Sequence, residues 1–163
     1  MPRIITALLT AIIMAFTLNP GSVCAAPPLF TIVFGDGAAQ RTVAVDDDML
    51  QQIAAKEIYT KVVSLNSDVR SVRGVLARDL LKHVGATGTM ATISALDDYQ
   101  IEIPLGDFTQ YDVVIAVEID GKRLTVRDKG PAWVIYPVSS HPELDHQVYE
   151  SRSVWQIKTI EIK

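Results

Sequence analysis

The densest group of side chains that could do chemistry lies in one polar stretch near the end of the chain. Residues 139–150 include His141, Glu143, Asp145 and His146, each a possible metal ligand. Two histidines five positions apart match no standard zinc motif, and a second pair of ligands would have to come from elsewhere. A solvated polar loop is the better interpretation, because loops are commonly polar and exposed. We therefore predict no metal site and keep His141 as a candidate ligand contact.

Cysteine, the side chain best suited to soft-metal chemistry, occurs once, at Cys24. It follows Arg3, an uncharged apolar run over residues 4–18 and a helix-breaking Asn-Pro-Gly. This order predicts a secretory signal peptide over residues 1–25, cleaved after Ala25. An uncleaved membrane anchor is the weaker alternative, because the run falls short of the ~20 apolar residues that span a bilayer.

Cleavage would leave residues 26–163 as one periplasmic or secreted domain, without a thiol, without a disulfide and without membrane insertion. The chain has 15 Lys and Arg against 19 Asp and Glu. This acidic balance argues against nucleic acid or an anionic membrane surface as partner, since both need clustered positive charge. A hydrolase is also unsupported, because no Ser-His-Asp arrangement, glycine-rich phosphate loop or paired-carboxylate signature stands out.

Two groups of charged residues have both a plain and a functional interpretation. Arg70, Arg73 and Arg78 form a basic cluster, which serves either solubility or an anion-binding edge, and we favour solubility. Asp128 and Lys129 precede a Gly-Pro turn. They are either simple turn residues or contacts to a ligand.

The elements that must position these residues are mostly short strands. Two helices are indicated, one from Asp46 towards Ile58 and one over residues 76–84 with Gly85 as its left-handed cap. Asp120-Gly121 is a two-residue hairpin turn. Strand patterns cover residues 29–34, 41–45, 58–64, 90–95, 99–103, 113–119, 123–126, 133–136 and 160–163. The pattern predicts a single α+β domain of mixed or antiparallel β-sheet with two or three short helices.

From Gly74 onward an ordered set of motifs resembles a known family. The motifs are Gly-Val-Leu-Ala-Arg-Asp-Leu-Leu at 74–81, Ala-Leu-Asp-Asp-Tyr at 95–99, Glu-Ile-Pro-Leu at 102–105, Val-Glu-Ile-Asp-Gly at 117–121, Asp-Lys-Gly-Pro at 128–131 and Ser-Arg-Ser-Val-Trp at 151–155. Together they are similar to the oxidoreductase molybdopterin-binding domain, the fold of sulfite oxidases and their bacterial relatives. In that family a helix opens with Gly-Val, which would start a helix at Gly74.

The resemblance implies a cleft that holds a molybdenum–pterin cofactor in the enzymes. Asp98 and Tyr99 match a turn that faces this cleft, Lys129 lies at the turn on its edge, and Arg152 takes the place of the basic residue near the pterin phosphate. An arginine fork suits a phosphate or carboxylate. The enzymes' metal-binding cysteine precedes the Gly-Val helix. Here residues 58–64 hold Thr60 and other hydroxyls instead, which substitute poorly for a thiolate.

The leading hypothesis is therefore an exported domain of this family that serves as a ligand-binding, accessory or sensory module. Its partner would be a small anionic ligand or a membrane-bound sensor or redox protein, and its site would comprise Thr60, Asp98, Tyr99, Lys129, His141 and Arg152. The rival is a periplasmic molybdenum–pterin oxidoreductase that holds its cofactor without a cysteine. A third alternative is a structural protein with an empty cleft.

Overall fold

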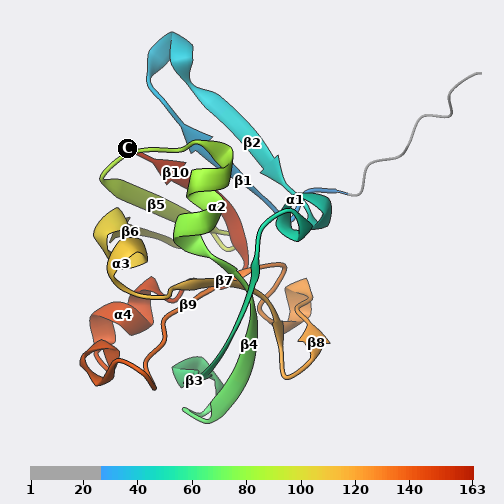
Figure 1. Ribbon diagram of the computed structural model, residues 1–163, viewed down its shortest axis with the longest axis vertical. Helices are drawn as coiled ribbons and strands as arrows, with labels where there is room; N and C mark the ends of the chain where they lie inside the picture. Colours follow the sequence, from blue (N-terminus) through green and yellow to red (C-terminus); the bar gives the residue numbers. More distant parts are fainter. Residues whose placement is uncertain (1–26) are drawn as a thin grey trace, which may run out of the picture.

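The computed structural model describes residues 27–163 and folds them into one α+β domain built on two β-sheets (Figure 1). This confirms the predicted fold class. The predicted signal peptide over residues 1–25 lies outside the described residues, as does Cys24. No helix within residues 27–163 is long and apolar enough to cross a membrane.

The first sheet has the strand order β2-β1-β10-β5-β6. Its strands are β1 (Phe30–Phe34), β2 (Arg41–Val45), β5 (Met90–Ala95), β6 (Gln100–Pro104) and β10 (Ile157–Ile162). β1 and β10 run parallel, and the other neighbouring pairs are antiparallel. The last strand of the chain therefore lies in the middle of the sheet, where β1 and β5 cover both of its edges.

The second sheet has the order β3-β4-β7-β8, and β9 also pairs with β7. Its strands are β3 (Ala55–Lys61), β4 (Val69–Leu76), β7 (Val114–Ile119), β8 (Lys122–Arg123) and β9 (Trp133–Ile135). Successive residues of β7 face opposite sides, so that Ile115 joins the main core while Val114 and Ala116 join a second cluster. Both faces of this sheet are thus covered by apolar side chains.

Four α-helices occur within the described residues: α1 (Asp47–Gln51), α2 (Ala77–Val84), α3 (Leu105–Gln110) and α4 (Gln147–Arg152). Single 3-10 turns lie at Gly37–Ala39, Val63–Leu65, Val126–Asp128 and Pro142–Leu144. α2 ends at Gly85 in the left-handed conformation (φ 75°), as the sequence predicts. α3 and α4 lie on the same side of the molecule (Figure 1).

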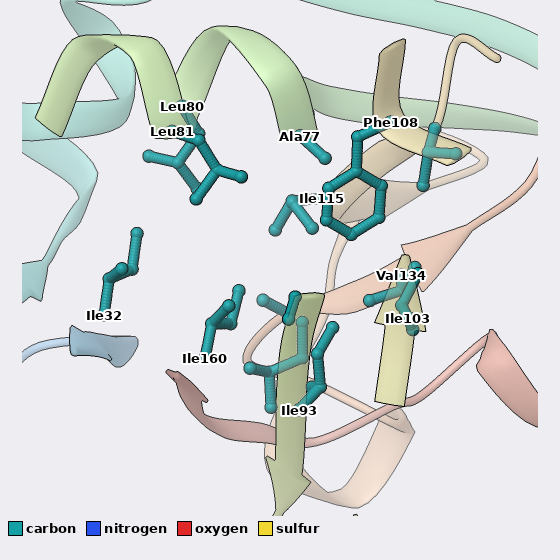
Figure 2. Close-up of a cluster of buried hydrophobic side chains, with 14 of the residues drawn as sticks. Ile32, Ala77, Leu80, Leu81, Ile93, Ile103, Phe108, Ile115, Val134 and Ile160 are labelled. Carbon is teal, nitrogen blue, oxygen red and sulfur yellow. The ribbon is translucent and has the colours of Figure 1, made fainter. Parts of the chain in front are cut away.

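The main core lies under α2. Figure 2 shows Ala77, Leu80 and Leu81 of this helix directed at isoleucines of both sheets. The isoleucines labelled there are Ile32, Ile93, Ile103, Ile115 and Ile160. Each fully buried side chain of this kind contributes about 1.5–3 kcal/mol relative to an exposed one. This packing holds the two sheets together and fixes the strands that carry the candidate site.

The predicted helix start at Gly74 is wrong, because Gly74 and Val75 belong to β4 and α2 begins at Ala77. Gly74 pairs with Ala116 of β7 next to a register shift. A Cβ atom at Gly74 would lie 2.0 Å from the carbonyl oxygen of Ile115. Close strand approach, not helix initiation, is therefore the physical reason for glycine at this position.

Three other boundaries also differ from the predicted ones. α1 ends at Gln51, and residues 55–61 form β3, where burial follows the two-residue period of a strand. β8 ends at Arg123 instead of continuing to residue 126. The predicted loop over residues 139–150 contains a 3-10 turn and most of α4, which begins after His146 caps its first turn.

Candidate functional site

A cleft opens between α4 and the turn that follows β3. It consists of two adjoining pockets of about 150 and 360 Å³, which share Ser64, Gln147, Glu150 and Ser153 as lining residues. We call it the α4 cleft. The turn supplies Ser64 because β3 ends at Lys61 and the chain then makes a 3-10 turn over Val63–Leu65. Ser64 thus lies at the junction of the two pockets.

The larger pocket combines aromatic rings with acidic groups. Tyr99 comes from the turn between β5 and β6, and Trp155 from the segment before β10. Both side chains are unusually exposed for aromatic residues, at 45% and 36%. Asp97 and Glu150 supply carboxylates to the same pocket. This half of the cleft can stack a ring or accept hydrogen bonds from a ligand.

The smaller pocket is mixed in charge. Lys61 and Asp145 line it and lie 4.0 Å apart, with side chains about half exposed. His146 lines it as well, but its Nδ1 accepts a hydrogen bond from the amide of Val148 at 3.3 Å as part of the cap of α4. The net charge of the whole cleft is therefore not positive, and its lining offers little to an anion.

Thr60 takes a structural place beside the cleft. It is the one buried polar residue in the described part of the chain, at 1% exposure. Its hydroxyl accepts a hydrogen bond from the amide of Ser139 at 3.1 Å and donates to the carbonyl of Tyr136 at 3.4 Å. The Ser139 hydroxyl in turn accepts from the amide of Lys61 at 2.9 Å. Thr60 thus ties β3 to the segment after β9.

Arg152 is directed at α3. Its Nη1 atom donates to Asp107 Oδ2 at 2.8 Å, and the two side chains are only 20% and 13% exposed. The same carboxylate oxygen accepts from the Tyr136 hydroxyl at 2.8 Å. Burial, followed by this bond to Asp107, raises the pKa of Tyr136 far above its usual range. The Arg152 guanidinium also lies over the Tyr149 ring, 5.6 Å from its centroid. Arg152 therefore fixes α4, the wall of the cleft, to α3.

The other predicted site residues are dispersed. Tyr99 lines the cleft and donates from its hydroxyl to the carbonyl of Ser151 in α4 at 3.2 Å. Its neighbour Asp98 instead pairs with Lys158 at 3.3 Å. His141 lies 3.2 Å from Glu143 and packs its ring edge-on to Tyr111. Of the six predicted residues, Tyr99 alone lines the α4 cleft, and whether any of the six binds a ligand stays a prediction.

Lys129 lies outside the α4 cleft, beside the two tryptophans. Its backbone is left-handed (φ 65°), and its Nζ atom lies 3.9 Å from the ring centroid of Trp155 and 5.2 Å from that of Trp133. The two rings contact each other edge-on, with centroids 6.2 Å apart. Burial lowers the pKa of the Lys129 ammonium below its usual range.

Sequence reasoning missed the residues of α4 that line the cleft, Gln147, Glu150 and Ser151, and Ser153, which follows the helix. The only sequence signal is weak: a capping residue, His146, precedes a six-residue segment in a polar stretch. The separation of one helical turn between Gln147 and Glu150 places both on one face. Such a short helix gains its stability from tertiary contacts, so no local pattern predicts it well.

The donor set does not fit a molybdenum–pterin cofactor held in the way that the family resemblance implies. Residues 27–163 contain no cysteine. The hydroxyl of Thr60 is engaged by the main chain, so Ser64 offers the available hydroxyl at this point of the cleft. A hydroxyl is a poor substitute for a soft thiolate ligand. Arg152, which would meet the phosphate, is paired with Asp107 instead.

Comparison with known protein families and with solved structures gives matches of both kinds. Residues 53–140, more than half of the chain, match the family described as the oxidoreductase molybdopterin binding domain. The structure resembles the crystal structure of the sulfane dehydrogenase SoxCD from Paracoccus pantotrophus, with a TM-score of 0.58 and 13% sequence identity. That match covers 83% of this chain and 38% of that chain, so this protein spans well under half of its neighbour's length. No curated protein matches the sequence.

Proposed function

Since this chain belongs to the oxidoreductase molybdopterin-binding domain family, we propose that it is an exported ligand-binding module, with an accessory or sensory role, that binds a small molecule in the α4 cleft. One observation carries the proposal. A cleft lies beside residues 58–64, and the cysteine-free donor set around that cleft is suited to hydrogen bonding and ring stacking. Binding is therefore the chemistry that these residues support best.

The lining of the cleft suggests the class of ligand. Ser64 and Ser153 offer hydroxyls, Gln147 offers an amide, and Tyr99 and Trp155 offer rings. Ligand sites commonly combine apolar walls with a few polar groups that fix the orientation of the bound molecule. A small neutral or cationic molecule with a flat ring meets these conditions, because the two carboxylates of the larger pocket disfavour an anion there.

Export and a membrane-bound sensor or redox partner belong to the same proposal, and they rest on the N-terminal sequence alone. The rival function, an oxidoreductase that holds molybdenum–pterin without a cysteine, would need cationic side chains free to meet the pterin phosphate. Among the described residues that line the α4 cleft, Lys61 is the only lysine or arginine, and its Nζ atom lies 4.0 Å from the Asp145 carboxylate. We therefore favour the binding module.

A thermal-shift screen of small molecules tests the proposal. A ligand at 100 times its dissociation constant stabilises the protein by about 2.7 kcal/mol, which raises the melting temperature measurably. The key variant is Ser64→Tyr, because its ring would fill the junction of the two pockets. The control is Ser140→Tyr, which adds the same ring at an exposed serine outside the cleft.

The proposal predicts that at least one ring-bearing compound stabilises the wild type and Ser140→Tyr but not Ser64→Tyr. A screen in which no compound shifts the wild type would speak for the structural alternative, an empty cleft. Equal shifts in all three proteins would place the ligand outside the α4 cleft.

A further inference from the structure

A second hollow, of about 490 Å³, is lined by Trp133 and by residues that lie outside the α4 cleft. It is bounded by β8, by the 3-10 turn over Val126–Asp128 and by Lys129. We call it the basic hollow. Trp133 is the single residue that lines both it and the α4 cleft. The two sites can therefore be tested separately.

Positive charge gathers around this hollow although the chain as a whole carries a net charge of −4. Its basic lining residues are Lys122, Arg123, Arg127 and Lys129. Arg123 forms a salt bridge with Asp47, whereas the other three form none with any described residue. The one acidic lining residue, Asp128, accepts a hydrogen bond from the Thr125 hydroxyl at 2.8 Å. The hollow thus has unpaired cations to offer.

Lys129 is the cation with most to gain from an anion. Its ammonium lies over the rings of both Trp133 and Trp155, and its side chain is partly withdrawn from water. That withdrawal lowers its pKa, and no described carboxylate compensates for it. An anion placed beside this ammonium would restore a charge-assisted hydrogen bond, which is the strong kind.

The floor of the hollow is apolar. Ile119, Leu124 and Trp133 are buried at its base, and Leu65 packs against the same cluster. Val126, 54% exposed, precedes Arg127 in the turn that borders the hollow. The apolar floor and the cationic border together suit a molecule with an apolar body and an anionic end. The body would pack on the floor, and the anionic end would contact the basic side chains of the border.

We propose that the basic hollow binds a small carboxylate or phosphate carried on an apolar or aromatic body, with Lys129 holding the anionic group. The site is independent of the small molecule in the α4 cleft. Under this proposal, the small anionic ligand that the sequence predicts would bind here and not in the α4 cleft.

Intrinsic fluorescence tests this proposal directly, because Trp133 and Trp155 are the two tryptophans of the chain and both contact Lys129. The probes are phenyl phosphate and benzoate, with inorganic phosphate as the probe lacking an apolar body and benzyl alcohol as the probe lacking charge. Lys129→Met removes the ammonium and keeps an unbranched side chain, and Arg127→Gln removes a second cation from an exposed position. The control is Lys82→Gln, which removes the same charge from an exposed position of α2.

Phenyl phosphate or benzoate should change the fluorescence saturably. Inorganic phosphate and benzyl alcohol should bind at least tenfold more weakly. Lys129→Met should weaken binding by about tenfold or more and Arg127→Gln by a few fold, because charge-assisted bonds are lost. Lys82→Gln and the cleft variant Ser64→Tyr should leave binding unchanged. The proposal is overturned if neither anion saturates, if Lys129→Met and Arg127→Gln bind like the wild type, or if vesicles of phosphatidylglycerol bind while the soluble anions do not.

Discussion

Replacing Asp107 with asparagine removes the charge that holds α4 against α3. The carboxylate lies 2.8 Å from Arg152 Nη1 and 2.8 Å from the Tyr136 hydroxyl. Asparagine keeps an oxygen that can accept from Tyr136, but it leaves the guanidinium without its counter-charge. Arg152 cannot lose its proton, so it must either remain unpaired or pull away from the helix.

The size of the effect follows from how far the pair is buried. Breaking a fully buried pair by removing one partner costs about 3–5 kcal/mol, whereas an exposed pair contributes about 0–1 kcal/mol. The side chains of Arg152 and Asp107 are 20% and 13% exposed, which is nearer the buried limit. We expect Asp107→Asn to lower the free energy of unfolding by about 2–3 kcal/mol. The whole free energy of unfolding of a small domain is only about 5–15 kcal/mol.

Urea denaturation followed by circular dichroism measures this loss, with Asp98→Asn as the matched control. Asp98 pairs with Lys158 at 3.3 Å, but the side chains are 88% and 54% exposed, so that loss should stay below about 0.5 kcal/mol. A double-mutant cycle with Arg152→Gln should give a coupling energy of about 1–2 kcal/mol. If Asp107→Asn lowers the midpoint no more than Asp98→Asn does, Arg152 does not anchor α4, and its role as a ligand contact regains support.

Three further changes test the positions that shape the site. Gly74→Ala should cost about 3 kcal/mol or more, or prevent folding, because its Cβ would lie 2.0 Å from the Ile115 carbonyl oxygen; circular dichroism and urea midpoints report it. Thr60→Val should cost about 1–3 kcal/mol, because the Ser139 amide loses its acceptor, and Thr60→Ser should recover most of that loss in the same assay. Hydrogen bonds from the Lys56 and Arg78 side chains lower the pKa of Asp112 in the folded protein. The ion pairs of Asp112 therefore stabilise the fold fully at a pH above the pKa that this carboxyl has in the unfolded chain. This stabilisation is lost as the pH falls through the lower pKa of the folded state. Asp112→Asn should remove about 1 kcal/mol at neutral pH and almost nothing at the acid end, since the pairs are partly exposed; equal losses at both ends of the pH range would contradict this.

Local signals in the sequence predict the elements whose chemistry is itself local. The Asp120-Gly121 turn, with φ of 49° and 72°, joins β7 to β8 as a two-residue hairpin should. The left-handed cap at Gly85 ends α2 where it is predicted. Trp133 and Tyr136, three positions apart in an extended segment, belong to different core clusters, as the two-residue period of a strand requires.

Long-range contacts account for what the sequence does not predict. β4 escapes prediction because its arginines indicate surface, and its buried end at residues 74–76 runs straight into α2 without a polar break. The family resemblance singles out Arg152 as a ligand contact, yet its partner Asp107 lies 45 positions away in the chain. The burial of Thr60 likewise depends on residues almost 80 positions further on. No local pattern carries such information.

Elemental and pterin analysis of the purified protein tests the central claim most directly. The protein should be purified from the periplasm of a host that makes the molybdenum cofactor, and its molybdenum and its pterin fluorescence after denaturation should be measured per chain. A ligand-binding module without a thiolate should show neither above the background of an unrelated exported protein. One molybdenum and one pterin per chain, both lost in Arg152→Ala, would contradict the account and establish the cofactor-dependent oxidoreductase instead.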